Sequence, residues 1–353
     1  MKEASTSPDK ITILRMSAIG DALMLLPAIR LLKKQFPNTQ IDWLIDRPIA
    51  SLFAEVSEVN IVAIDKPRSF KDYWQFKKNG SNKNVGQLIS FQTSMVSNLV
   101  MGLLSADHKT GFGRPYSREG HRFFTNTAYD LKPKLHQVEI FHALVEHFSG
   151  LDDNGMIANK DLILPLNNND ILWGKEKLKS HSKWIAINPM ASTQEKTWLE
   201  SHYVNLIKSL GMEYPEYQIV LTGGPSAQEI QFSQSIQSQL SKPCLNLVGQ
   251  TSLTQLAAIL KQVNLVISPD TGPLHLANAV ATPVIGLYAV TRPEYIGPYN
   301  QLQNCIDFYA QTAQKVLHKT AEQLPWQKKI SSLDAMSSIS VEHVLNKVHQ
   351  QKL

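Results

Sequence analysis

An alternation of short apolar runs with helical patterns constrains this chain more than any other feature, and it occurs twice. In the first half, the runs ITILR, IDWLID and NIVAID occupy residues 11–15, 41–46 and 60–65, and a helical pattern covers residues 22–36. Continuous apolar runs are typical of buried parallel strands. Strands that alternate with helices form β-α-β units with right-handed crossovers. The sequence therefore predicts a parallel sheet in this half.

The second half has the same alternation of apolar runs and helical patterns. Its main strand candidates are KWIAINP, YQIVLTGG, NLVIS and PVIGLY, at residues 183–189, 217–224, 264–268 and 283–288. Helices are expected near residues 202–212, 226–240 and 253–261, and a short one from Pro273. The fold class we expect is α/β, with two Rossmann-like β/α/β domains that face a central cleft and bind ligands at the carboxyl ends of their strands.

Residues 152–170 are rich in Asp and Asn, have no clear period and are the expected linker. We accordingly place an N-terminal domain at residues 1–165 and a C-terminal domain at residues 166–330. Residues 331–353 are expected to form a C-terminal helix that packs back on the N-terminal domain. Two domains agree with a usual size of about 150 residues each.

The first half also contains less regular stretches. Pro27 lies early in its helix, where proline is tolerated better than in the middle and allows either a continuous or a kinked helix. Residues 66–84 are polar and basic and are expected to form a loop or a poorly ordered excursion. A strand from Val85, a helix over residues 93–106, a Gly- and Arg-rich loop over 111–120 and a helix over 136–148 should follow.

Composition limits the class of protein and its partners. The formal net charge of +5 suits an anionic partner without choosing between nucleic acid, a phosphorylated substrate and a membrane surface. Cys244 and Cys305 form no metal-binding pattern and are expected to be isolated reduced thiols. The polar first ten residues contain no apolar signal core, and the apolar stretch at residues 22–32 is too short to span a bilayer. We expect a cytoplasmic protein with peripheral membrane contact at most.

Several common nucleotide motifs are missing. The sequence contains neither GxGxxG after its first strand nor GxxxxGK[ST], so it lacks the dinucleotide and P-loop fingerprints. It also has no D-x-D pair, the arrangement with which many sugar transferases hold a divalent ion. We therefore expect the chemistry of this chain to require no metal and no cofactor.

The best candidate for an anion site is the strand-to-helix turn formed by Asp270, Thr271 and Gly272. Amide groups at a helix N-terminus bind anions, and a diphosphate is the natural occupant. The alternative is that Asp270 only caps the helix. Gly223 and Gly224 follow a neighbouring strand and offer a second place where backbone can approach a ligand.

Further candidates for binding the diphosphate lie in the loop after the first strand of the second half. Ser192, Thr193 and Lys196 supply hydroxyl groups and an ammonium group that can neutralise a leaving diphosphate without a metal. His275 lies in the first turn of the helix after Gly272 and either donates to a phosphate or packs.

On the acceptor side, Asp21 stands at the start of the helix that follows the first strand. A carboxylate there can accept a proton from an attacking hydroxyl, or it can simply complement the helix dipole. Two basic clusters lie on predicted loops of the same domain and suit phosphate or carboxylate groups, or are merely solvated. They are Lys66, Arg68 and Lys71 (the 66–71 cluster) and Arg114, Arg118 and Arg122.

Several of these segments resemble glycosyltransferase family 9, the lipopolysaccharide heptosyltransferases. ILRMSAIGDALMLLPAIRLLKKQFP resembles the family's opening, and SPDTGPLHLANAVATPVIGLYAVTRPEYIGPY resembles its second signature. VLTGGP and LVGQTSLTQLAAIL are also similar. Within the family, the SREG and FFTN stretches, the HQVE segment at residues 136–139 and the IGPY ending look most like heptosyltransferase I.

The resemblance implies a GT-B fold and an inverting transfer of heptose from ADP-heptose to the Kdo region of lipid A, at the inner face of the inner membrane, with no nucleic-acid partner. It makes Asp21 the base and assigns Lys196, Asp270, Thr271, Gly272 and His275 to the donor. It assigns Arg118 and the 66–71 cluster to the acidic acceptor. Residues 66–84 do not align cleanly, and ISFQTS replaces the usual acidic residue after the fourth strand, which leaves the acceptor open.

Two alternatives stay open. One is a family 9 transferase with another sugar or core acceptor. The other is a non-catalytic nucleotide-sugar binding protein that keeps the fold; the Asp at position 21 disfavours it, because binding alone does not require a base.

Overall fold

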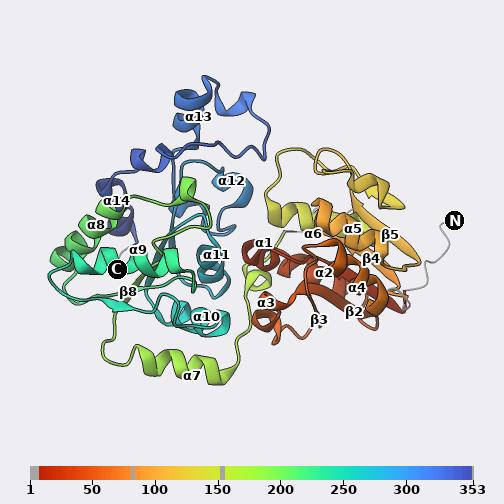
Figure 1. The fold of residues 1–353 in the computed structure, drawn as a ribbon, viewed down its shortest axis with the longest axis horizontal. Coiled ribbons are helices and arrows are strands. Elements are labelled where there is room, and N and C mark those ends of the chain that lie inside the picture. The colour runs from red at the N-terminus through yellow and green to blue at the C-terminus, as the bar shows by residue number, and fades with distance from the viewer. Residues whose placement is uncertain (1–7, 81–83, 152–155, 352–353) are drawn as a thin grey trace. The chain divides into compact units, whose positions relative to one another are not determined.

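The computed structural model describes residues 8–80, 84–151 and 156–351. The chain divides into two compact units, Met1–Leu164 and Pro165–Leu353 (Figure 1). The division falls one residue before the expected boundary. The described part of residues 152–170 contains a short 3-10 helix, Asn159–Leu162, and the start of α7 (Asn168–Lys177). Residues 152–155 of that predicted linker lie outside the described residues.

The first unit is built on a parallel sheet of six described strands in the order β3-β2-β1-β4-β5-β6. Its strands are β1 (Lys10–Leu14), β2 (Gln40–Asp46), β3 (Asn60–Ile64), β4 (Gln87–Ser90), β5 (His108–Phe112) and β6 (Thr127–Tyr129). The strand order reverses between β1 and β4, and a reversal of this kind leaves a ligand-binding crevice at the carboxyl ends of the two strands. The loops after β1 and β4 are therefore where this unit's site is expected.

The helices of this unit are α1 (Ile19–Met24), α2 (Leu26–Gln35), α3 (Arg47–Ala50), α4 (Phe70–Gly80), α5 (Met95–Leu103) and α6 (Gln137–Ser149). The single helix predicted for residues 22–36 is divided at Leu25, and Pro27 occupies the first turn of α2. Proline has no amide hydrogen to donate, so the first turn of a new helix is where it fits best.

The loop predicted for residues 66–84 is wrong over α4. Tyr73 and Phe76 are three residues apart on this helix and pack against a core that includes Leu14 and Leu88. Residues separated by three positions share a helix face, so this pair anchors the helix to the sheet. The many lysines of the segment concealed this two-residue signal. Residues 81–83 lie outside the described residues.

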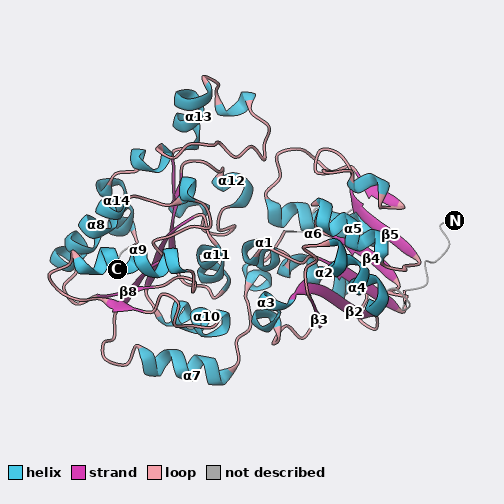
Figure 2. Cartoon of the chain, in the orientation of Figure 1, coloured by secondary structure: helices cyan, strands magenta, loops and turns pink. Residues whose placement is uncertain are grey.

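The second unit repeats the same topology, with the strand order β12-β11-β10-β7-β8-β9, all parallel (Figure 2). Its strands are β7 (Trp184–Ile187), β8 (Gln218–Leu221), β9 (Leu245–Asn246), β10 (Leu265–Pro269), β11 (Val284–Tyr288) and β12 (Cys305–Asp307). The central strands β7, β10 and β11 are fully buried, which is why they read as continuous apolar runs.

The remaining helices are α8 (Glu200–Glu213), α9 (Ala227–Ser238), α10 (Leu253–Gln262), α11 (Gly272–Ala279), α12 (Pro293–Ile296), α13 (Tyr309–Leu317) and α14 (Val341–Gln350). The C-terminal helix α14 was expected to pack on the N-terminal domain. Its Val344 and Val348 instead lie in the core of the second unit, and α14 packs against α8 (Figure 1). An apolar stripe shows that a helix is anchored, but it does not identify the sheet it covers.

Two simpler expectations concern the thiols and the membrane. Cys244 and Cys305 are free cysteines, as predicted. None of the helices that the structure describes has the length and apolar character needed to cross a bilayer.

Candidate active site

Asp21 lies in the first turn of α1, directly beyond the carboxyl end of β1. Its Oδ2 atom is 2.5 Å from Arg15 Nη2 and accepts a hydrogen bond of 3.3 Å from the Ala18 amide. The side chain keeps 30% of its surface exposed, so the carboxylate is held in place but remains open to a ligand. This is a suitable environment for a proton acceptor.

Arg15, which sequence reasoning missed, holds that carboxylate from the protein interior. It is almost fully buried, its Nη1 donates to the Phe91 carbonyl at 2.6 Å, and its guanidinium lies 5.3 Å from the centre of the Phe141 ring. Buried arginines are rare unless they are paired. The sequence offered one indication of this role, namely that Arg15 is the only charged residue of the predicted strand ITILR.

Two other loops reach the same turn. Lys66, from the loop after β3, donates from Nζ to Ser17 Oγ at 3.2 Å. Gln92, from the loop after β4, accepts from the Met16 amide at 2.9 Å through Oε1. Gln92 belongs to the ISFQTS stretch at residues 89–94. The structure thus brings Lys66 to the turn that carries Asp21.

The other predicted acceptor residues do not gather around Asp21 in the same way. Arg68, Lys71, Arg114, Arg118 and Arg122 are all exposed. Within the described part of the chain, their side-chain nitrogens form no hydrogen bond or ion pair. The loop that carries Arg118 is braced by Asn98 of α5, whose amide group donates to the Glu119 carbonyl at 2.9 Å. It presents free cations on a fixed backbone.

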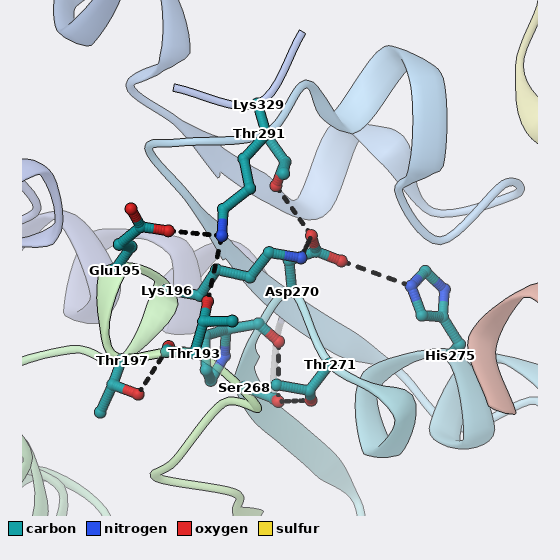
Figure 3. A network of polar contacts seen from close by, with 11 residues as sticks. Thr193, Glu195, Lys196, Thr197, Ser268, Asp270, Thr271, His275, Thr291 and Lys329 are labelled. Atoms are coloured by element: carbon teal, nitrogen blue, oxygen red, sulfur yellow. Dashed lines mark hydrogen bonds and ion pairs between the residues drawn. The ribbon is translucent and has the colours of Figure 1, made fainter. Parts of the chain in front are cut away.

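In the second unit, Asp270 is the centre of a buried polar network (Figure 3). Its Oδ2 accepts from Lys196 Nζ at 2.5 Å and from Thr291 Oγ1 at 2.8 Å, and its Oδ1 lies 3.5 Å from His275 Nε2. Burial raises the pKa of this carboxyl, but contacts with His275 and Lys196 outweigh burial and bring the pKa down to about 2. Asp270 is therefore a permanent anion that fixes the Lys196 ammonium and the His275 ring.

Asp270 does not cap α11. The N-cap position is Thr271, whose hydroxyl lies 2.8 Å from that of Ser268 rather than on a helix amide. Gly272 and Pro273 open the helix. The first-turn amides are thus not covered by the Asp270 side chain, so the capping alternative is wrong.

Lys196 belongs to a short 3-10 helix, Gln194–Lys196, that begins after Thr193. Thr197 stiffens the loop because its hydroxyl donates to the Thr193 carbonyl at 3.3 Å and accepts from the Ala191 amide at 3.2 Å. Ser192 is exposed on this loop. The loop also carries Glu195, which forms an ion pair with Lys329 and which, like Thr291 and Lys329, sequence reasoning did not select.

The Gly223–Gly224 turn has a partner within its own unit. The Gly224 amide donates to Glu229 Oε2 at 2.5 Å, and a Cβ atom at Gly224 would lie 2.8 Å from Oε1 of that residue. The near atoms belong to the end of the flexible Glu229 side chain, so a larger residue at position 224 would displace that carboxylate rather than the backbone. The sequence analysis did not select Glu229. Its carboxylate accepts a hydrogen bond from the backbone amide that was expected to face a ligand.

No three His, Cys, Asp or Glu residues in the described part of the chain lie close enough together to hold a metal ion. Both candidate sites instead contain carboxylates that are paired with lysine or arginine.

Comparison with known proteins places these sites in context. The sequence model of glycosyltransferase family 9 (heptosyltransferase) matches residues 73–327. The chain is 29% identical to the lipopolysaccharide core heptosyltransferase OpsX of Haemophilus influenzae, over 97% of this chain and 96% of that protein. It is 27% identical to lipopolysaccharide heptosyltransferase 3 of Escherichia coli K12, over 89% and 91%.

Solved structures share the fold. A family 9 glycosyltransferase from Veillonella parvula superposes with a TM-score of 0.75 at 19% identity, covering 97% of both chains. E. coli heptosyltransferase WaaC with ADP superposes with a TM-score of 0.72 at 19% identity, covering 97% of this chain and 99% of that one. The predicted GT-B fold, with two Rossmann-like parallel sheets, is confirmed.

Proposed function

This chain belongs to glycosyltransferase family 9, and on that premise we propose that it transfers heptose from ADP-heptose to the Kdo region of the lipopolysaccharide inner core. The observation that carries the proposal is the Lys196–Asp270 pair. A buried, permanently charged carboxylate holds an ammonium group beside the first turn of α11. That arrangement suits a diphosphate leaving group.

The donor diphosphate is placed by this proposal against Lys196 and the first-turn amides of α11. Lys196 keeps 18% of its side-chain surface exposed, whereas Asp270 keeps 5%, so the cation faces outward and its counter-ion does not. His275 contacts Asp270 through Nε2 and is the third residue of this proposed phosphate site. Fixed cations and amides stabilise the negative charge that develops on a departing diphosphate.

Asp21 is the proposed base. It takes the proton of the acceptor hydroxyl while that oxygen attacks the anomeric carbon and the bond from this carbon to the ADP oxygen breaks. One displacement by one nucleophile inverts the anomeric configuration, and no covalent enzyme intermediate forms. Arg15 keeps the carboxylate oriented for this step from its buried position.

The acceptor is proposed to bind the first unit at the cytoplasmic face of the inner membrane. Kdo carries a carboxylate and lipid A carries phosphates, which match Lys66 and the exposed arginines. Helix α4 supports a peripheral membrane contact, because Phe70 and Trp74 are 94% and 63% exposed and Lys78 lies over the Trp74 ring. Aromatic rings next to lysines are typical of protein surfaces at a lipid interface.

A second candidate is transfer to another core position. The curated relatives include lipopolysaccharide heptosyltransferases 1, 2 and 3, so similarity alone does not select one acceptor. The same donor site would then serve a different acceptor sugar.

Mass spectrometry of products tests the proposal. Purified protein is incubated with ADP-heptose and either Kdo-lipid A or the same acceptor already carrying one heptose. We expect a gain of one heptose on Kdo-lipid A only. A gain only on the heptosylated acceptor would favour the second candidate, and binding of ADP-heptose without any product would favour a non-catalytic protein.

A further inference from the structure

The chain makes an excursion between β12 and α14 that has a small core of its own. Tyr309, Ala313, Ala321 and Ile330 are buried together, and α13 stands apart from α8, α9 and α14 (Figure 1). The core Rossmann topology does not need this segment, because β12 already ends the sheet. Its position calls for another explanation.

The excursion is fastened to the end of β11. Arg292 lies 4.4 Å from the centre of the Tyr309 ring and 5.2 Å from that of Trp326. The Ile330 amide donates to the Val290 carbonyl at 2.9 Å. These contacts fix the backbone on both sides of Lys329, since Tyr309 also donates from its hydroxyl to the Lys328 carbonyl at 2.8 Å.

The fastened segment carries Lys329 to the loop of Lys196 (Figure 3). Its Nζ donates to Thr193 Oγ1 at 3.3 Å and forms an ion pair with Glu195, which also accepts from the Ser331 hydroxyl. Two ammonium groups therefore border one short 3-10 helix: Lys196 belongs to it, and Lys329 contacts the Thr193 side chain at its start.

We propose that Lys329 is a second cation for the donor diphosphate, supplied to the Lys196 loop by the excursion between β12 and α14. The assignment rests on the proposed function, since it adds a residue to the same donor site. Lys329 interacts with the nucleotide's phosphate oxygens, and Lys196 acts beside it.

The Lys329–Glu195 ion pair can rearrange more readily than the Lys196–Asp270 ion pair. The Asp270 side chain is only 5% exposed, so water cannot take the place of Lys196 beside it. The Glu195 side chain is 20% exposed and the Lys329 side chain is 38% exposed. Lys329 can therefore leave Glu195 for a phosphate at small cost, because Glu195 is then solvated and stays bonded to Ser331. Two lysines also match the charge of a diphosphate better than one.

Binding of ADP and of adenosine to the full-length protein, measured by titration calorimetry, tests this. Lys329→Gln should weaken ADP binding by about tenfold or more, the effect of losing a charge-assisted hydrogen bond, and leave adenosine binding unchanged. Lys328→Gln is the matched control, because Lys328 is the exposed neighbouring lysine, and it should bind ADP like the wild type. Lys329→Arg should restore most of the affinity.

Glu195→Gln separates a ligand role from a structural one. This variant removes the ion pair but keeps the Lys329 ammonium, so ADP binding should stay equal or become tighter. Equal losses of ADP affinity in Glu195→Gln and Lys329→Gln would show that the pair only fastens the excursion and would overturn the proposal. Wild-type affinity in Lys329→Gln, with weakened binding in Lys196→Gln, would overturn it while leaving the donor site intact. A wild-type protein that binds no ADP would contradict the donor site itself.

Discussion

Arg15 Nη2 lies 2.5 Å from Asp21 Oδ2. This contact couples a buried cation to the carboxylate that follows β1. Because Arg15 is also bonded to the Phe91 carbonyl and stacked on Phe141, its position is set by the core rather than by Asp21. The carboxylate is thus oriented by the protein interior before any ligand arrives.

This coupling predicts that substitutions at the two positions are not additive. Arg15→Gln should lower turnover because Asp21 loses its fixed partner, and adding Arg15→Gln to Asp21→Asn should lower turnover little further. A double-mutant cycle on the rate of product formation should give a coupling free energy of about 0.5–3 kcal/mol. Additive effects would show that Arg15 influences turnover independently of Asp21, and denaturation curves of the four proteins control for losses of stability.

Metal dependence is the second prediction. We expect full transfer activity in excess EDTA, because the sequence has no D-x-D pair and Lys196 supplies positive charge at the diphosphate. The measurement compares initial rates before and after chelation and after addition of magnesium or manganese. Loss of activity with EDTA that magnesium or manganese restores would refute the prediction.

The third prediction concerns the acceptor. Neutralising Arg118, or the 66–71 cluster, should raise the acceptor KM and leave donor affinity nearly unchanged. A basic residue near an anionic lipid surface contributes about 1 kcal/mol, so Arg118→Gln should raise KM roughly fivefold. Lys66→Gln should have the largest single effect in the cluster, because Lys66 alone of these residues contacts the turn of Asp21.

Steady-state kinetics with varied acceptor provide the measurement. Lys242→Gln, at an exposed lysine of the second unit, is the matched control and should leave the acceptor KM unchanged. Raised salt should weaken acceptor use more in the wild type than in the neutralised variants, since exposed charges are screened. An unchanged acceptor KM in both variants would place the acceptor site elsewhere.

His121 gives the fourth prediction, on pH. Its Nδ1 lies 2.7 Å from Asn98 Oδ1 under the loop of Arg118, and burial lowers its pKa to about 4. An unfolded chain protonates histidine near pH 6.5, so between these pH values the unfolded state binds more protons than the folded state. The free energy of unfolding should therefore fall as the pH drops from about 6.5 to 4, by up to roughly 3 kcal/mol.

Denaturant unfolding at pH 7 and pH 4.5 measures this effect. His121→Gln keeps a donor for Asn98 but cannot titrate, so its stability should fall less than that of the wild type between the two pH values. Equal losses in the two proteins would assign the pH dependence to other groups.

The sequence predicted the strands of both sheets best where they are buried on both faces. β11 lies within the apolar run that predicted it, and β1, β2 and β10 each extend one residue beyond theirs. Short edge strands such as β6 and β12 were missed because three residues carry too little pattern. Helix α4 was missed because only Tyr73 and Phe76 mark its buried face.

The site was predictable where one short segment contains it and not where distant segments meet. Asp270, Thr271 and Gly272 stand together in one turn, so a sequence motif was enough to propose them. Lys329 is far from Thr193 in sequence, and only the folded excursion brings the two together. Arg15 and Glu229 were missed for the same reason, since their importance lies in contacts with other segments.

The central claim is that Asp21 is the base for heptosyl transfer, and the single-turnover rate of Asp21→Asn tests it most directly. Asparagine keeps the size of the side chain but accepts no proton. With ADP-heptose and Kdo-lipid A at saturating concentrations, product formation should be slower by roughly 10²–10⁴-fold, while ADP affinity stays at the wild-type value. A folded Asp21→Asn protein that forms product at nearly the wild-type rate would contradict the account.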